Sequence, residues 1–236
     1  MAADTMRDST AHDWWATFDC YGTLIDWNGG IRAALARAFG ETRADGQLRR
    51  FHEIEPGLQK DGRRTYRDVL TEAMRELGAD ADRVTALAES LPEWPAFPDV
   101  RPALEALRAK GWRLAILSNT DRDYIDASIR RIGVPIDLAI VASEIGSYKP
   151  APRHWTEFFT RSGADRARHV HVAASLFHDI EPAANLGLRA VWINRLGERS
   201  PLPRLRELPD LADLPATLSS LRAAPSQAAG DHQRSS

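Results

Sequence analysis

The segment WWATFDCYGTLIDW, residues 14–27, constrains the fold of this chain more than any other feature. An apolar, aromatic run ends abruptly at Asp19, and a turn containing Gly22 follows. A buried strand that delivers a carboxylate at its C-terminal end, before such a turn, is typical of open α/β sheets that present a reactive group. A carboxylate there costs stability unless something uses or compensates it. We therefore predict that Asp19 is a catalytic nucleophile; the alternative is a capping residue at a strand–loop junction.

Short apolar runs alternate with helix-sized segments along the rest of the chain. This alternation predicts an α/β fold, with a Rossmann-like parallel sheet and crossover helices. The predicted strands are Trp14–Phe18, Leu114–Leu117, Leu138–Ala142, Val170–Ala174 and Ala190–Ile193.

The first gap between strands is helical throughout, which predicts an all-helical module over residues 27–94. Apolar residues there recur at three- and four-residue spacing. Asp80 is expected to cap a helix start and Gly78 to end a helix. The helical stretches are Ile31–Phe39, a segment from Leu48, Thr65–Gly78 and Ala81–Leu91. The α/β core then comprises 13–26 and 95–224, between a disordered leader, 1–12, and a disordered tail, 225–236.

Composition excludes several classes of protein. The 236 residues are 43% hydrophobic, enough for a real core, and the net charge of −2 argues against general nucleic-acid binding. No apolar run approaches the length needed to span a membrane, and the polar N-terminus does not resemble a signal peptide. The single cysteine, Cys20, excludes an internal disulfide and fits a reducing compartment. These observations favour a cytoplasmic enzyme, in which Cys20 packs between sheet and helix.

Polar side chains follow four of the predicted strands, which a purely structural role would not require. Because the carboxyl ends of parallel strands converge on one edge of the sheet, these side chains can share a cleft. They are Asp19 and Thr23 after the first strand, Ser118 and Asn119 after the second, Lys149 after the third, and Ser175 and Asp179 after the fourth.

This ordered set resembles the haloacid dehalogenase (HAD) superfamily of hydrolases, whose four motifs fall on Asp19, Ser118, Lys149 and Asp179. More narrowly, FDCYGTL, LSNTD, SYKP and AVWINR look like the type II 2-haloacid dehalogenase branch. The resemblance implies that the helical module is a cap over the active site. It also implies a homodimer.

The branch determines the expected reaction. Phosphatases of this superfamily carry a second aspartate two positions after the nucleophile, where this chain has Tyr21, and typically an acid before the serine of the fourth motif, where it has Ala174. Mg²⁺ favours several hard oxygen ligands, so the resemblance implies an enzyme without metal or cofactor. A magnesium-dependent phosphatase acting on a small metabolite remains the first alternative.

The dehalogenase resemblance implies a covalent mechanism on a small 2-haloacid. Asp19 would attack the carbon that bears the halogen, and water would release a 2-hydroxy acid from the resulting ester. Lys149 would keep Asp19 ionised and oriented, while Asp179 would pair with Lys149 and position or activate the water. Hydrogen bonds to the carboxylates and the ester oxyanion are assigned to Thr23, Ser118 and Asn119.

Several positions depart from the branch pattern. Ala174 and Leu176 stand where the branch has a serine and an asparagine, and Trp155 stands where a tyrosine is usual. These departures motivate the second alternative, a non-catalytic binding protein of the same fold.

The substrate pocket is predicted from fewer signals. The cap should supply an arginine to the substrate carboxylate, and Arg50 is the best match by register, with Arg49 as the fallback. Glu53 and Glu55 are interpreted as surface or cap-interface acids. The predicted substrate-binding residues are Tyr21, Arg50, Trp155, Ser175 and His178.

Overall fold

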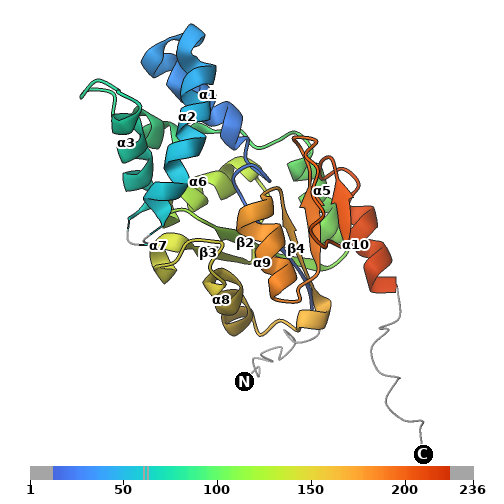
Figure 1. Ribbon diagram of the computed structural model, residues 1–236. Coiled ribbons are helices and arrows are strands. Elements are labelled where there is room, and N and C mark those ends of the chain that lie inside the picture. The colour runs from blue at the N-terminus through green and yellow to red at the C-terminus, as the bar shows by residue number, and fades with distance from the viewer. Residues whose placement is uncertain (1–12, 61, 63, 224–236) are drawn as a thin grey trace, which may run out of the picture.

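The computed structural model describes residues 13–223 except 61 and 63; the predicted leader and tail lie outside the described residues. Its centre is a six-stranded, wholly parallel sheet with strand order β3-β2-β1-β4-β5-β6 (Figure 1). The α/β, Rossmann-like prediction is confirmed. The strands are β1 (Trp14–Phe18), β2 (Trp112–Ser118), β3 (Leu138–Val141), β4 (His169–Ala173), β5 (Ala190–Ile193) and β6 (Arg206–Leu208).

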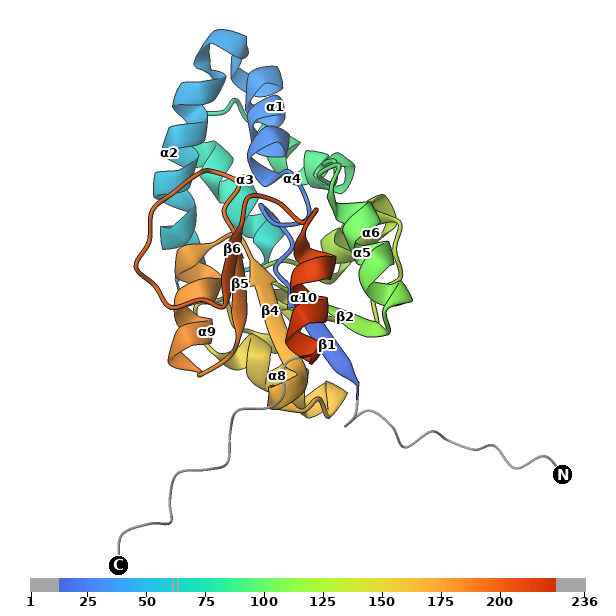
Figure 2. The same cartoon turned by 90° about the vertical axis from the view of Figure 1, so that its right-hand side faces the viewer.

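Helices cover both faces of this sheet, as Figure 2 shows. Successive strand residues point to opposite faces, so Phe18 and Ile116 pack with α5, α6 and α10, whereas Trp15 and Leu117 pack with α8 and α9. The result is a three-layer α/β/α core. The helices of this core are α5 (Val100–Ala109), α6 (Arg122–Ile132), α7 (Ala142–Ile145), α8 (Arg153–Ser162), α9 (Glu181–Asn185) and α10 (Leu214–Ala223), with short turns at Arg166–Arg168 (3₁₀) and Leu176–Ile180 (π-helical).

The segment between β1 and α5 is helical, and its helices gather over the carboxyl ends of the strands (Figure 1). One helical prediction is wrong in its start: residues 81–85 form turns, and the helix begins after Thr85 rather than at a cap provided by Asp80. Gly78, with φ of +82°, does follow the end of a helix. These elements are α1 (Trp27–Phe39), α2 (Glu41–Gln59), α3 (Tyr66–Glu76), α4 (Ala86–Ser90) and a 3₁₀ turn, Leu91–Glu93. We call them the cap helices.

Direct hydrogen bonds join the cap helices to the core. The carboxylate of Asp121, at the start of α6, accepts from the backbone amides of Tyr66 and Arg67, both at 2.9 Å. These amides belong to the first turn of α3, where backbone donors lack partners inside the helix. Gly30 of α1 packs so closely on Trp94 that a Cβ atom would lie 2.3 Å from the indole ring. Glycine is therefore required at that crossing.

The strand β6 was not predicted from the sequence. It has only three residues at the edge of the sheet, and two of them are exposed, so it lacks the apolar run of a buried strand. Within the described part of the chain, no helix is long and apolar enough to cross a membrane.

Candidate active site

A buried lysine between two carboxylates forms the floor of the site. The Lys149 Nζ atom donates to Asp19 Oδ1 at 2.9 Å, to Asp179 Oδ1 at 2.6 Å and to the Leu117 carbonyl at 2.8 Å. Asp19 follows β1, Asp179 lies in the turn after β4, and Lys149 lies in the loop after α7. Since neighbouring parallel strands end at one edge, three residues far apart in sequence meet there, as the strand-end argument predicts.

The three charges do not share their interactions equally. Burial raises the pKa of Asp19, and Lys149 and Thr23 oppose that rise. Burial acts on Asp179 in the same sense, but Lys149 and His171 outweigh it and hold the pKa of Asp179 below its usual value. The two carboxylates raise the pKa of Lys149 against the effect of burial. Asp19 is consequently the more basic carboxylate, which suits a nucleophile.

The turn after β1 fixes the Asp19 carboxylate from its other side. Thr23 Oγ1 donates to Asp19 Oδ2 at 2.9 Å and accepts from the Ala174 amide at 2.9 Å. Gly22, with φ of +88°, allows the chain to reverse between the two residues. In the described part of the chain, the backbone amides of Cys20 and Tyr21 have no hydrogen-bond acceptor. Two unpaired donors therefore lie next to Asp19 in the chain.

Ser118 and Asn119, which follow β2, occupy different places. Ser118 Oγ is buried, lines the cavity and makes no hydrogen bond to the described residues, so it is available to a ligand. Asn119 accepts from the Lys149 amide at 2.6 Å and donates to the Lys149 carbonyl at 3.0 Å. Asn119 lines the cavity, and its amide group holds the backbone of Lys149; its predicted hydrogen bonds to the carboxylates and the ester oxyanion stay a prediction.

A buried network of hydrogen-bonded side chains next to Asp179 was not predicted from the sequence. His171 Nε2 lies 2.9 Å from Asp179 Oδ1, and Thr17 Oγ1 bridges His171 Nδ1 and His169 Nε2 at 2.8 Å each. The signal was the alternation HVHVA in β4, which places both histidines on one face of the strand. Burial lowers the pKa of His169, which keeps that imidazole neutral.

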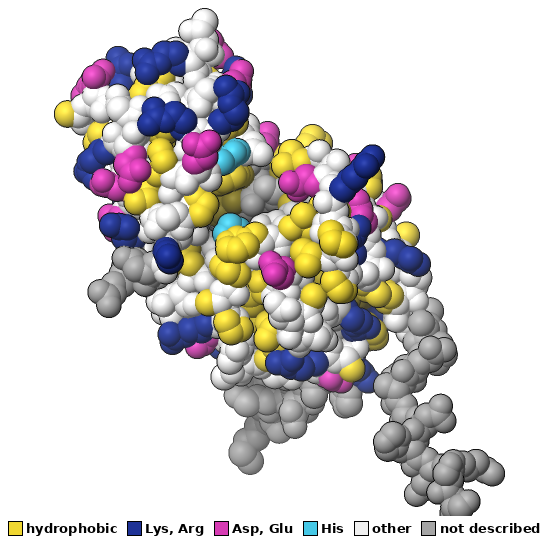
Figure 3. Space-filling view, in the orientation of Figure 1, with side chains coloured by type: hydrophobic (Ala, Val, Ile, Leu, Met, Phe, Trp, Pro, Cys, Tyr) yellow, Lys and Arg dark blue, Asp and Glu magenta, His cyan; other side chains and the backbone are white. Residues whose placement is uncertain are grey.

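Above the floor lies a cavity of about 590 Å³ between the core and the cap helices. Figure 3 shows this hollow below the lobe formed by the cap helices. Tyr21, Ser175 and His178 line it, as predicted. The Tyr21 ring stacks on that of Tyr66, with centroids 6.3 Å apart, and its hydroxyl lies 3.0 Å from Ser128 Oγ. Ser175 Oγ accepts from the His178 amide at 3.1 Å, and burial lowers the pKa of His178.

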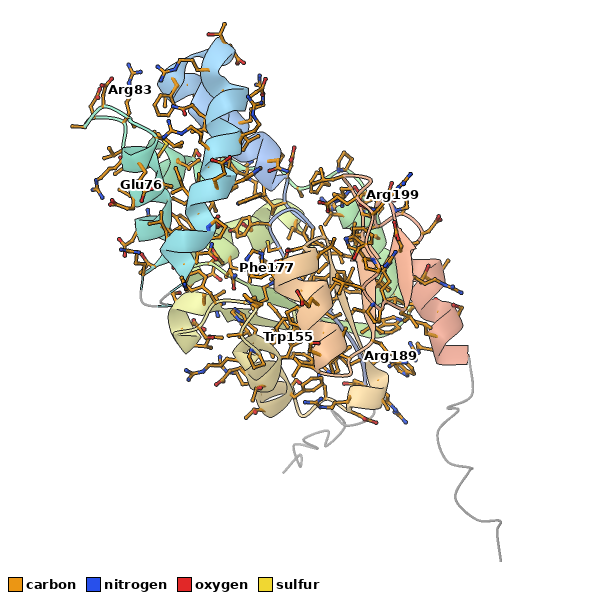
Figure 4. All side chains as sticks on the ribbon, viewed as in Figure 1. Glu76, Arg83, Trp155, Phe177, Arg189 and Arg199 are labelled. Carbon is orange, nitrogen blue, oxygen red and sulfur yellow. The ribbon has the colours of Figure 1, made fainter. Side chains whose placement is uncertain are left out.

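Two predicted substrate-binding residues do not reach this cavity. Trp155 is 1% exposed and packs against His171 in the core, with ring centroids 5.4 Å apart; Figure 4 shows it well below Phe177, which lines the cavity. Arg50 lies on the exposed side of α2 and contacts the Glu76 carbonyl at 3.4 Å. Arg49 is exposed as well. The register argument failed because the helical period turns another face of α2 toward the cavity.

That inward face of α2 carries Glu55 and Gln59, both buried and both lining the cavity. Gln59 donates to the Glu55 carboxylate, and Asn119 Nδ2 donates to Gln59 Oε1 at 3.4 Å. Burial raises the pKa of Glu55 to about 7, and a hydrogen bond from Tyr66 opposes the rise. The interpretation of Glu55 as a surface or cap-interface acid therefore missed its place in the cavity wall.

Comparison with known proteins identifies the family of this chain. A family model described as haloacid dehalogenase-like hydrolase matches residues 15–187. The chain belongs to the haloacid dehalogenase-like hydrolases. It is 29% identical to (S)-2-haloacid dehalogenase 1 of Pseudomonas sp. (strain CBS-3), over 85% of this chain and 94% of that protein. It is also 28% identical to a phosphoserine phosphatase of Thermus thermophilus, but over 54% and 53% of the two chains.

A solved structure shows the same fold. The L-2-haloacid dehalogenase from Xanthobacter autotrophicus with chloropropionic acid covalently bound superimposes with a TM-score of 0.77. The match covers 88% of this chain and 98% of that one, at 20% sequence identity. The predicted resemblance to the superfamily is confirmed by the family-model match.

The donor set of this haloacid dehalogenase-like hydrolase does not fit the magnesium site of the family's phosphatases. The Lys149 ammonium already lies between the two carboxylates that would have to share the cation. Tyr21 offers a phenol in place of a second carboxylate, and its hydroxyl pairs with Ser128. Across residues 13–223, leaving out 61 and 63, no three His, Cys, Asp or Glu side chains come together to hold a metal ion.

Proposed function

We propose that this protein hydrolyses the carbon–halogen bond of short 2-haloacids through a covalent ester on Asp19, without a metal ion. The observation that carries the proposal is the position of Asp19, buried at the cavity floor with both oxygens held by Lys149 and Thr23. The similarity to 2-haloacid dehalogenases over most of the chain supports it. Displacement of a halide from carbon requires an oriented carboxylate and no divalent ion. The groups on the cavity floor meet this requirement.

In the first step, an oxygen of Asp19 attacks the carbon that bears the halogen. The new carbon–oxygen bond forms as the carbon–halogen bond breaks, and the halide leaves with the electron pair. Chloride or bromide needs no proton to leave. The raised pKa of Asp19 makes its carboxylate a better electron-pair donor, and the ion pair with Lys149 fixes its direction.

The substrate carboxylate would be held by neutral donors. Among the described residues, Ser118 Oγ is buried at the cavity floor without a partner, and the amides of Cys20 and Tyr21 beside the nucleophile have no acceptor. Such fixed donors stabilise an anion without bringing a second charge into the site. Arg50, on the outside of α2, has no part in this proposal.

In the second step, water attacks the Asp19 carbonyl carbon of the ester. Lys149 stabilises the oxyanion, and the leaving alkoxide takes one proton of the attacking water to give the 2-hydroxy acid. The other proton of that water goes to solvent, which regenerates the Asp19 carboxylate. The hydroxyl oxygen of the product comes from Asp19, and water replaces it in the carboxylate. Asp179 Oδ2 is buried, has no hydrogen-bond partner in the part of the chain that the structure describes, and can accept from the attacking water. Since Ala174 and Leu176 cannot do so, Asp179 orients this water.

The test is halide release from chloroacetate and 2-chloropropionate in the presence of EDTA, for the wild type and Asp19→Asn. We expect release from the wild type that persists in EDTA and disappears in the variant. Magnesium-dependent phosphate release without halide release would establish the phosphatase alternative, to which similarity with a phosphoserine phosphatase points. If the protein catalyses neither reaction, the remaining alternative is a non-catalytic binding protein of the same fold.

A cytoplasmic location and a homodimer complete the proposal. The single, buried Cys20 fits a reducing compartment, since its environment raises the thiol pKa and keeps it unreactive. Sedimentation of the purified protein tests the dimer.

A further inference from the structure

Among the residues that the structure describes, the wall of the cavity contributed by the cap helices holds an acid but no available cation. Among the described lining residues, Lys149 and Arg195 are the two long cationic side chains. Lys149 is paired with both floor carboxylates. Arg195 pairs with Asp99 at 2.8 Å and donates to the Thr23 carbonyl at 2.9 Å. An anionic group on the substrate would therefore find no free cation on this wall.

Two histidines do not supply the missing charge. Burial lowers the pKa of His52 and that of His178. His52 stacks on Trp27 with ring centroids 5.1 Å apart, and its Nε2 atom lies 3.0 Å from Asn28 Oδ1. Both imidazoles are thus neutral at pH 7, and the described residues of the wall carry no positive charge.

Glu55 is the charged group that this wall does offer. Its side chain is on the inward face of α2, and the residue is 5% exposed. Its partners are neutral: the amide of Gln59 on the same helix and the phenol of Tyr66 on α3, which also accepts from Trp27 Nε1 at 3.0 Å. The rings of Trp27 and Tyr66 line the cavity too. A carboxylate beside electron-rich rings suits an ammonium group.

The size of the cavity also calls for a longer substrate. Pockets of roughly 300–1,000 Å³ enclose drug-sized ligands, and this cavity of about 590 Å³ lies in that range. A haloacetate has only a handful of heavy atoms and would leave most of the space to water. Asp19 and Ser118 line the floor, whereas Glu55 and Gln59 line the wall, so a chain that extends from the reacting carbon can reach the cap helices.

We propose that Glu55 is the specificity-determining residue of a tail subsite, and that the substrate is a 2-haloacid whose chain carries a protonated amine. This inference rests on the proposed function. The carboxylate and the halogen-bearing carbon lie at the floor, and the ammonium group donates to Glu55 between the rings of Trp27 and Tyr66. Pairing with the amine offsets the cost of ionising a buried acid whose pKa burial has raised.

The test compares three chlorinated acids at pH 8 with EDTA: 4-amino-2-chlorobutanoate, its neutral isostere 2-chloropentanoate, and the diacid 2-chloroglutarate. A hydrogen bond to a charged group corresponds to roughly a tenfold to hundredfold effect. We expect kcat/KM for the amine to exceed that for the isostere by at least about tenfold, with the diacid slowest. Glu55→Gln should bring the ratio of amine to isostere close to one. Glu53→Gln, an exposed acid on the same helix, should keep the wild-type ratio.

Product inhibition of the wild type provides a second measurement that needs no variant. We expect 4-amino-2-hydroxybutanoate to inhibit halide release at about tenfold lower concentration than 2-hydroxyglutarate. Equal or reversed inhibition overturns the inference. So does a wild type that prefers the isostere or the diacid, or a preference for the amine that survives Glu55→Gln. In each case, Asp19-dependent halide release from chloroacetate would still support the proposed function, whereas its absence would refute that function separately.

Discussion

Buried charges have different partners on the floor of the cavity and on the wall contributed by the cap helices. On the floor, one ammonium satisfies two carboxylates at 2.9 and 2.6 Å, and every charge has an opposite charge beside it. On the wall, Glu55 is also buried, but the described partners of its carboxyl group are Gln59 and Tyr66, both of which are neutral. The charges on the floor are therefore paired without a ligand, whereas the wall would be stabilised by a cationic one.

Because of this difference, we assign the chemical step to the floor and substrate selectivity to the wall. A floor whose charges are already paired can form and release a covalent bond on Asp19 with little rearrangement, because its donors are already oriented. The wall makes no contact with the reacting atoms in the proposed mechanism, and its acid can discriminate between substrates. Changes to the floor should abolish turnover or stability, and changes to the wall should alter preference or pH dependence.

The largest effect is expected for Asp19→Asn. The amide keeps the size of the side chain but removes the nucleophilic charge, so halide release should fall by about 10⁴-fold or more. Halide release in EDTA measures it, and circular dichroism serves as the control for folding. Retention of more than a few per cent of wild-type activity would mean that Asp19 is not the nucleophile.

Next is Lys149→Met, which tests the pairing on the floor. It leaves Asp19 and Asp179 buried without a counter-charge, and breaking a buried ion pair in this way costs about 3–5 kcal/mol of folding stability. Urea denaturation at pH 7 measures the loss. The matched control is Lys60→Met, an exposed lysine whose replacement should change stability by less than about 0.5 kcal/mol. Equal stability of the two variants would contradict the account of the floor.

On the wall, Glu55→Gln should change the pH dependence of stability. The pKa of Glu55 is raised from 4.5 to about 7 in the folded state, so the wild type loses stability as pH rises through that range. The variant lacks this loss. It should be more stable than the wild type by up to about 3 kcal/mol above pH 7, and the difference should vanish below about pH 4.5. Urea midpoints across pH 4–9 measure it, with Glu53→Gln as the control; parallel profiles for wild type and Glu55→Gln would contradict the burial of this acid.

The smallest effect is expected for Arg50→Ala. Because Arg50 lies on the outside of α2, its loss should change kcat/KM for 2-chloropropionate by less than about twofold. A rise in KM of tenfold or more would support the prediction that Arg50 binds the substrate carboxylate. It would also contradict the proposed difference between floor and wall.

The sequence predicts the floor better than the wall for a physical reason. Asp19, Lys149 and Asp179 were identified because parallel strands must end at one edge, which ties strand order to position. The wall depends on the rotation of helices, and a small error in helical phase moves a residue from the cavity to the solvent. Register against the family therefore selected Arg50 on the outer face of α2 and passed over Glu55 on the inner face.

The surroundings of two further residues were not predicted from the sequence. Trp155 was assigned to the substrate pocket because it stands where the family usually has a tyrosine, but the inward face of α8 carries it into the core beside His171. The contacts of Asn119 with the backbone of Lys149 were not predicted; they form because the two loops run side by side. Such contacts between loops leave no periodic signal in the sequence.

The most direct test of the central claim is a single turnover of 2-chloropropionate in H₂¹⁸O with excess enzyme and EDTA. If Asp19 forms the ester, the first lactate released carries unlabelled oxygen, and mass spectrometry finds one ¹⁸O in the peptide that contains Asp19. If water attacks the substrate carbon directly, the first lactate carries ¹⁸O and Asp19 stays unlabelled, which would contradict the covalent mechanism.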